Sequence, residues 1–158
     1  MKTVYIVRHG KTNRGVNDLD RELLPLGIER ISKLGKYLFV NNCNVDIFYS
    51  SYAKRAVQTA NIIAEKIDYQ KDEIITSKSL YFTTQEEYFN IIMGLDSDFN
   101  SVMIVGHNPE ITNVAQFFIP DFTAYMQTGA CFCFDFYTDE WTKIFTAERK
   151  NRFYVHFQ

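Results

Sequence analysis

The sequence predicts an α/β fold: a three-layer sandwich with a mostly parallel central sheet, an antiparallel edge and helices on both faces. Short apolar runs rich in β-branched residues alternate with segments whose apolar residues recur at helical spacing, which is typical of parallel sheets with crossover helices. Towards the end of the chain, aromatic residues alternate over residues 131–136 before a turn-like segment. That pattern predicts a hairpin, and therefore at least one antiparallel edge.

The first half of the chain alternates strands and helices. Residues 3–8 form an apolar run that stops at a polar, glycine-containing turn, and Ile31, Leu34 and Leu38 share one helical face. Pro25 suits the first turn of that helix. We expect a strand over 3–8, a loop over 11–24 and a helix from Pro25 to about Asn41. A second strand over 45–49, stopped by Ser50 and Ser51, leads into a helix over 53–67. A short strand at 74–75 and irregular structure over 76–83 follow.

The second half begins with another helix and strand. Residues 101–105 are strongly apolar, which predicts a buried strand. Asn108 and Pro109 follow, and they suit the N-cap and the first position of the next helix. We expect a helix around 88–95, a strand over 101–105 and a helix around 111–118. A strand over 131–136 then pairs with a partner strand over 141–146 through a turn over 137–140. The chain closes with an edge strand over 153–157.

Composition predicts one globular domain over residues 1–158. Hydrophobic residues make up 46% of the chain, and the formal net charge of −2 argues against a generic polyanion binder. The N-terminal apolar run is too short for a signal peptide, and no run is long enough to span a membrane. The 3 cysteines are an odd, sparse set that suggests free thiols. We therefore expect a cytoplasmic protein, a monomer or weak dimer, with neither a nucleic-acid nor a membrane partner.

Cationic and imidazole side chains follow several of the expected strands. Arg8 and His9 end the first, Arg55 follows the second, and His107 follows the strand near residue 104. If the strands are parallel, their carboxyl ends share one edge of the sheet, where ligands bind in open α/β sheets. Guanidinium groups bind phosphate oxygens bidentately, and neighbouring cations keep an imidazole neutral and nucleophilic. The pattern therefore predicts a site suited to phosphoryl transfer, with His9 as nucleophile.

Several ordered segments resemble motifs of the histidine phosphatase superfamily, also called phosphoglycerate-mutase-like. Residues 7–12 (VRHGKT) resemble its signature, residues 20–27 its DRxLxxxG element, residues 50–60 its SxxxRAxQTA helix start, and residues 105–109 (VGHNP) its second-histidine motif. The resemblance implies the phosphoglycerate-mutase-like fold and a phosphohistidine intermediate on His9. It also implies that neither a metal nor another cofactor takes part.

The resemblance implies roles for single residues as well. Arg8, Arg55 and His107 would bind the phosphoryl group, and His107 would also stabilise the transition state. Further candidate substrate-binding residues, at the pocket loop and its rim, are Thr12, Asn13 and Arg21.

One departure from the family pattern concerns the general acid. Larger members carry a glutamate just after a leucine, where this chain has Leu80 and Tyr81. The candidate replacements are Glu86, Glu87 and Asp20. A short chain without the family's acid is similar to the SixA-type phosphohistidine phosphatases, whose phosphoramidate substrate has a labile P–N bond. We therefore expect a metal-independent phosphatase that acts on phosphohistidine, with a phosphohistidine protein domain as a partner.

Two other functions stay open at this point: a broad-specificity small-molecule phosphomonoesterase and a non-catalytic phosphate-binding module. A serine nucleophile at Ser50 or Ser51 is disfavoured because the chain has no Gly-x-Ser-x-Gly elbow. A zinc site built from His9, His107 and a cysteine is disfavoured because the flanking arginines would repel the cation.

Overall fold

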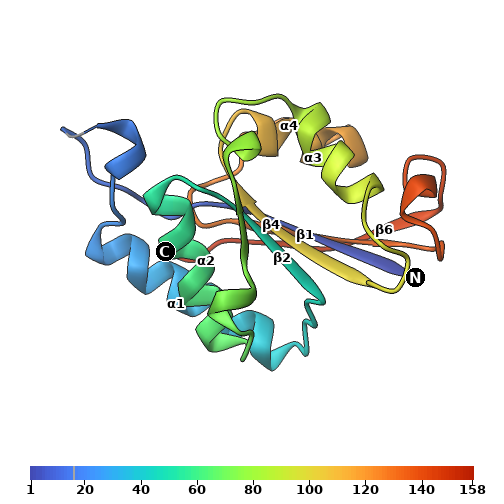
Figure 1. Cartoon of the computed structure of the whole chain (residues 1–158), viewed down its shortest axis with the longest axis horizontal. Coiled ribbons are helices and arrows are strands. Elements are labelled where there is room, and N and C mark those ends of the chain that lie inside the picture. Colours follow the sequence, from blue (N-terminus) through green and yellow to red (C-terminus); the bar gives the residue numbers. More distant parts are fainter. Residues whose placement is uncertain (16) are drawn as a thin grey trace.

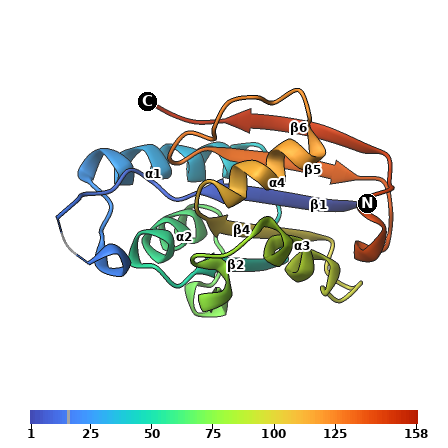
Figure 2. The same cartoon turned by 90° about the horizontal axis from the view of Figure 1, so that it is seen from above.

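The computed structural model describes residues 1–15 and 17–158 and shows a six-stranded sheet between helices (Figure 1). The strands are β1 (Lys2–Arg8), β2 (Ile47–Ser51), β3 (Ile75–Ser77), β4 (Ser101–Gly106), β5 (Cys131–Phe136) and β6 (Arg149–Val155). They lie in the order β3-β2-β4-β1-β5-β6, and Figure 2 labels β2, β4, β1, β5 and β6 in this sequence across the sheet. The first four of that order are parallel, and β5 and β6 add antiparallel pairs at one side. The predicted α/β sandwich is confirmed.

Helices cover both faces of the sheet. They are α1 (Pro25–Val40), α2 (Lys54–Lys66), α3 (Gln85–Met93) and α4 (Glu110–Phe118). Figure 1 shows α1 and α2 on one face and α3 and α4 on the other, and the buried residues form one cluster under each pair. Gly35 permits close packing of α1 on α2, because a Cβ at this position would come within 2.6 Å of Lys66 Cβ. Within the described part of the chain, no helix is both long and apolar enough to cross a membrane.

The first strand lies in the interior of the sheet and is buried on both sides. Val4 and Ile6 pack under α3 and α4, whereas Tyr5 and Val7 pack under α1 and α2. A strand covered on both faces is expected to be continuously apolar, which accounts for the run that opens the sequence. β1 pairs along its length with β4 and ends with Arg8 opposite the last residue of that strand. The polar residues that follow β1 and β4 therefore emerge side by side at one edge.

The expectation that Ser50 and Ser51 stop the second strand is wrong. Both serines belong to β2 and are fully buried. Ser50 Oγ donates to the Ser51 carbonyl at 2.9 Å. The hydroxyl is thereby satisfied inside the sheet, so the polar side chain does not end the strand. The segment expected to be irregular is also partly ordered, because β3 extends to Ser77 and a 3-10 turn follows over Lys78–Leu80.

The C-terminal hairpin uses a different segment from the one expected. β6 pairs with β5, whereas residues 141–143 form a 3-10 turn, so the predicted strand over 141–146 is wrong. Trp141 is buried, and its Nε1–H donates to the Phe99 carbonyl at 3.0 Å, which anchors this turn. Charged residues open β6, as is typical of an edge strand. They hide the start of the strand, so the predicted edge strand over 153–157 overlaps only the last residues of β6.

The expected N-cap of the fourth helix is also wrong. α4 begins at Glu110, and Pro109 occupies the preceding position. Asn108 has another role: its Nδ2 donates to the Met126 carbonyl at 3.1 Å, and its Oδ1 accepts from Thr112 Oγ1 at 2.6 Å. Asn108 therefore ties the end of β4 to the loop that precedes β5.

Candidate active site

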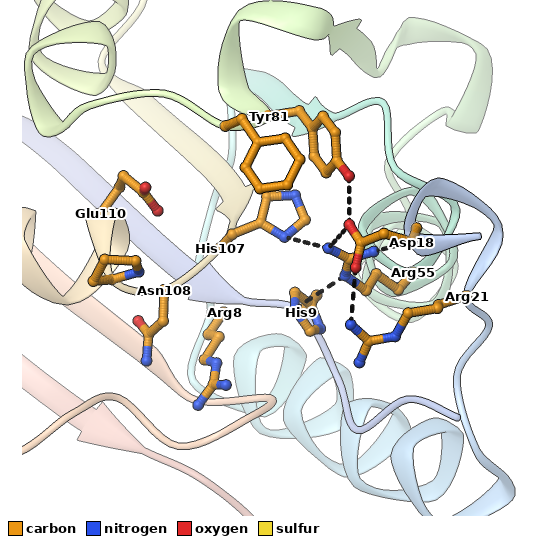
Figure 3. Close-up of a pocket in the computed structure, with 11 residues that line it drawn as sticks. Arg8, His9, Asp18, Arg21, Arg55, Tyr81, His107, Asn108 and Glu110 are labelled. Atoms are coloured by element: carbon orange, nitrogen blue, oxygen red, sulfur yellow. Dashed lines mark hydrogen bonds and ion pairs between the residues drawn. The ribbon is translucent and has the colours of Figure 1, made fainter. Parts of the chain in front are cut away.

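A cavity of about 300 Å³ lies at the edge of the sheet where the parallel strands end (Figure 3). Arg8 and His9 reach it from the end of β1, Arg55 from the first turn of α2, and His107 from the residue after β4. The rings of His9 and His107 lie 5.1 Å apart, centroid to centroid. The structure thus brings together the four side chains that the sequence predicted to meet.

His9 presents an unprotonated nitrogen to the cavity. Its Nδ1 lies 2.7 Å from the Gly10 carbonyl, which can only accept, so Nδ1 carries the proton. The lone pair is therefore on Nε2, which accepts from Arg55 Nε at 3.3 Å. Burial, and then the neighbouring His107, lower the pKa of His9 to about 3. The imidazole is therefore neutral at physiological pH, as a nucleophile must be.

Arg55 contacts both histidines and the loop that follows β1. Its Nη1 donates to the Asp18 carbonyl at 2.6 Å, and its Nη2 donates to Asp18 Oδ2 at 3.1 Å. The same Nη2 lies 3.4 Å from His107 Nδ1. The side chain is almost fully buried, so these contacts hold the guanidinium in one place between the two imidazoles.

His107 is held by the second strand and by the third helix. Its Nε2 lies 2.7 Å from Ser51 Oγ, and its backbone N–H donates to Tyr88 Oη at 3.3 Å. Because Arg55 can only donate to Nδ1, the proton of the neutral ring is on Nε2 and is donated to Ser51. Burial, and then the guanidinium of Arg55, lower the pKa of His107 to about 4. A second neutral imidazole therefore lies against the same guanidinium.

Arg8 enters the cavity from the other side. Its Nη1 donates to the Met126 carbonyl at 2.7 Å. Its Nε is buried and has no hydrogen-bond partner among the residues that the structure describes. A guanidinium with one fixed contact and a buried donor left over is suited to a bidentate oxyanion.

Asp18 is a carboxylate of the cavity that the sequence reasoning missed. Its Oδ2 accepts from Tyr81 Oη and from Arg55, and its Oδ1 accepts from Arg21 Nη1 at 3.0 Å (Figure 3). The hydrogen bond from Tyr81, and then those from the arginines, lower the pKa of Asp18 to about 2. Asp18 is therefore ionised at neutral pH and positions Arg21 and Arg55.

The comparisons with known proteins point to one family. The family model described as histidine phosphatase superfamily (branch 1) matches residues 4–80. The 2,3-bisphosphoglycerate-dependent phosphoglycerate mutases of Bacteroides fragilis and Nautilia profundicola are 35% and 34% identical to this chain, over 101 and 108 residues. Over residues 4–80 the chain is similar to the histidine phosphatase superfamily. Those matches cover 61% and 62% of this chain but only 39% and 43% of the two mutases, so the chain spans about two fifths of the relatives' length.

Several solved structures share the fold of this chain. A protein named phosphohistidine phosphatase SixA from Agrobacterium tumefaciens superposes with a TM-score of 0.84 at 20% identity, over 98% of this chain and 97% of that one. A protein histidine phosphatase SixA complexed with tungstate gives 0.83 at 14%, over 98% and 96%. A mycobacterial glucosyl-3-phosphoglycerate phosphatase gives 0.69 at 13%, over 96% and 97%. At these identities the likeness concerns the fold.

Of the predicted pocket-loop residues, Arg21 lines the cavity, whereas Thr12 and Asn13 are not among its lining residues. Thr12 Oγ1 accepts from Arg21 Nη2, and the Asn13 carbonyl accepts from Arg21 Nε at 3.0 Å. The structure therefore gives Thr12 and Asn13 a positioning role: they orient the guanidinium of Arg21.

The carboxylates predicted as replacement acids are not among the side chains that line the cavity. Asp20 and Glu86 are exposed, and Glu87 lies in the first turn of α3. The lining carboxylates are Asp18 and Glu110 instead. In the sequence, Asp18 is marked only by lying close to Arg21. Glu110 is marked only by following the second-histidine motif. Among residues 1–15 and 17–158, no group of three or more His, Cys, Asp or Glu is placed to hold a metal ion.

The two lowered histidine pKa values predict a loss of stability on mild acidification. In the unfolded chain both histidines titrate near 6.5, whereas in the folded chain they do so at about 3 and about 4. Between pH 6.5 and 4 the unfolded chain therefore binds more protons. The free energy of unfolding should fall by up to about 1.4 kcal/mol per pH unit for each histidine. Asp18 has a pKa of about 2, so its protonation affects stability only at lower pH than that of the two histidines.

Urea unfolding at pH 7.5, 6 and 5 measures this loss. The variant His9→Gln should reduce the slope of stability against pH by about half, since one of the two buried histidines is removed. His156→Gln, outside the cavity, is the matched control for the loss of a histidine side chain. A wild-type stability that is flat over this range would contradict the neutral state assigned to both rings.

Proposed function

We propose that this chain is a metal-independent phosphatase that forms a phosphohistidine intermediate on His9, and that its substrate is phosphohistidine in proteins. The observation that carries the proposal is the placement of the unprotonated His9 Nε2, which lies 3.3 Å from Arg55 Nε in a cavity also lined by Arg8, Arg21 and His107. A neutral nucleophile among guanidinium groups supports attack on a phosphoryl group.

In the proposed reaction, Arg8 and Arg55 hold the phosphoryl oxygens, and Arg55 exchanges its contact with His9 for one with the substrate. The lone pair on His9 Nε2 forms a bond to phosphorus. The bond from phosphorus to the leaving nitrogen breaks, and its electron pair stays on that nitrogen. Water then attacks phosphorus, the P–Nε2 bond breaks with its pair returning to His9, and the product phosphate takes up the proton from the water. The guanidinium groups and His107 stabilise the charge on the phosphoryl oxygens in both steps.

The preference for phosphohistidine is supported by the state of the cavity's acids. Asp18 is ionised and already accepts from Tyr81 and two arginines, so it is not available as a proton donor. An alkoxide needs such a donor to leave, whereas a phosphohistidine ring that carries a proton on its second nitrogen leaves as neutral imidazole, with the electron pair of the P–N bond on the first nitrogen. The likeness in fold to proteins named phosphohistidine phosphatase SixA agrees with this substrate.

A second candidate function is a broad-specificity small-molecule phosphomonoesterase. Two observations favour it: the relatives are named phosphoglycerate mutases, and a further carboxylate, that of Glu110, lines the cavity. In this function Glu110 would protonate the leaving oxygen.

Turnover of two matched peptides distinguishes the candidates. One peptide carries phosphohistidine and the other carries phosphoserine at the same position, and 3-phosphoglycerate serves as the small-molecule arm. We expect kcat/KM for the phosphohistidine peptide to exceed both others by at least about a hundredfold, equivalent to about 2.7 kcal/mol in barrier. A preference for 3-phosphoglycerate would favour the second candidate instead.

Quenching the reaction with radiolabelled phosphohistidine peptide provides the second readout. We expect an acid-labile phosphoenzyme whose label maps to the tryptic peptide that contains His9. Label that accumulates without release of phosphate would indicate a phosphate-binding module. Turnover with no label on His9 would contradict the covalent intermediate.

A further inference from the structure

Among the side chains that line the cavity, Phe82 and Glu110 have no part in holding or attacking the phosphoryl group in the proposed reaction. Phe82 comes from the segment between the 3-10 turn at Lys78–Leu80 and α3, and Glu110 is the first residue of α4. The cavity therefore extends from its guanidinium-lined part to a part lined by an aromatic ring and a carboxylate.

Phe82 is held in a conformation that core packing does not explain. Its side chain is 86% exposed, and its φ is +48°. This is the left-handed region, which bulky residues rarely adopt. Backbone conformations of this kind cluster at ligand-binding sites, where the surrounding structure maintains them. An aromatic ring kept at a cavity in this way indicates a surface for a ligand.

Tyr81 fixes the place of Phe82 relative to the phosphoryl site. The two rings are 4.4 Å apart, centroid to centroid, and the Tyr81 ring is edge-on to that of His107 at 5.6 Å. Tyr81 Oη also donates to Asp18. Phe82 is thus one aromatic ring away from the imidazole that faces Arg55. A planar group carried by a bound phosphoryl group can therefore stack against Phe82.

Glu110 differs from Asp18, the other carboxylate that lines the cavity. Asp18 accepts from Tyr81, Arg55 and Arg21, whereas no interaction joins Glu110 to any other residue drawn in Figure 3. The carboxylate of Glu110 is therefore available to accept an N–H from a ligand, with the added strength of a charged acceptor.

We propose that Phe82 and Glu110 form the leaving-group subsite of this cavity, and that the subsite takes a planar ring that carries an N–H. This inference rests on the proposed function, since the ring is the one bonded to the phosphoryl group. Phe82 binds the face of the ring, and Glu110 accepts the N–H of the nitrogen that is not bonded to phosphorus. When the P–N bond breaks, its electron pair stays on the first nitrogen and the proton stays on the second. The ring leaves as neutral imidazole.

Binding of inert phosphonates tests the subsite without turnover. Imidazolylphosphonate has a ring with an N–H, phenylphosphonate has a ring without one, and methylphosphonate has no ring. Calorimetric titration should give wild-type affinities in that descending order. Phe82→Ala should weaken both ring compounds about tenfold, the upper range for an aromatic pair, and leave methylphosphonate unchanged. Glu110→Gln should weaken imidazolylphosphonate about tenfold and leave phenylphosphonate unchanged.

Matched controls separate the subsite from general effects. Tyr137→Ala removes another exposed aromatic side chain, outside the cavity, and Glu86→Gln neutralises a carboxylate in the first turn of α3, as Glu110→Gln does in α4. Neither control should change any of the three affinities. Equal wild-type affinities, or equal loss for all three ligands in Phe82→Ala, would overturn the subsite. The protein could bind the two ring phosphonates more tightly than methylphosphonate and yet fail to hydrolyse phosphohistidine. That result would uphold the subsite and overturn only the proposed function.

Discussion

Replacing His9 by alanine is expected to lower kcat/KM for the phosphohistidine peptide by 10⁴-fold or more, the order found when a covalent nucleophile is removed. The reason is the unique position of its Nε2, which is unprotonated and faces Arg55. The arginines would still bind the phosphoryl group, so binding of methylphosphonate should persist. Steady-state kinetics and calorimetry on the same preparation separate the two effects.

The third histidine of the chain provides the control for this experiment. His156 follows β6 and is not among the residues that line the cavity, so His156→Ala should keep wild-type kinetics. Activity of His9→Ala within about tenfold of wild type would contradict a nucleophilic role, since no covalent route through His9 would then be needed.

Replacing Arg55 by alanine is expected to lower kcat by about a thousandfold, the usual effect of losing a group that stabilises charge in the transition state. Arg55→Lys should restore little of it. A lysine has one nitrogen where Arg55 uses three, on the Asp18 backbone and carboxylate and on the two histidines. The measurement is kcat for the phosphohistidine peptide, with circular dichroism to confirm folding.

The neighbouring residue supplies the matched control for Arg55. Lys54 also lies in the first turn of α2, but its side chain is half exposed and pairs with Glu22 at 2.6 Å. Lys54→Ala should leave kcat unchanged, because Lys54 does not line the cavity and an exposed ion pair contributes little to stability. Near-wild-type kcat in Arg55→Lys would show that only the positive charge of Arg55 matters. It would contradict the role given to its three nitrogens, which contact Asp18 and both histidines.

The residues predicted from strand ends were placed correctly because their position depends on few contacts. Arg8, His9 and His107 emerge from neighbouring parallel strands, so the order of the sheet alone brings them together. Arg55 was placed correctly because its helix, α2, starts soon after β2 and so carries its first turn to the same edge of the sheet. Short-range patterns and the direction of the strands were therefore enough to predict the core of the site.

The surrounding residues depend on contacts that no local pattern encodes. Asp18 lies in a 3-10 turn and meets Tyr81 across 63 positions of sequence. Ser51 was expected to end a strand, yet it is a buried strand residue that binds His107. The predicted edge strand over 153–157 overlaps only the end of β6, because charged residues open that strand, as is typical of sheet edges. Turns, buried hydroxyls and polar edges are set by tertiary packing, and that is where the expectations and the structure differ.

In the proposed reaction, product release would be an exchange of partners rather than a simple loss of contacts. Arg55 Nε donates to His9 Nε2 in the structure, while Nη1 and Nη2 donate to Asp18. A phosphoryl group that takes the contact of Arg55 Nε would give it back to His9 as the product departs. His9 would then compete with inorganic phosphate for the guanidinium, and we expect free phosphate to be a weak inhibitor.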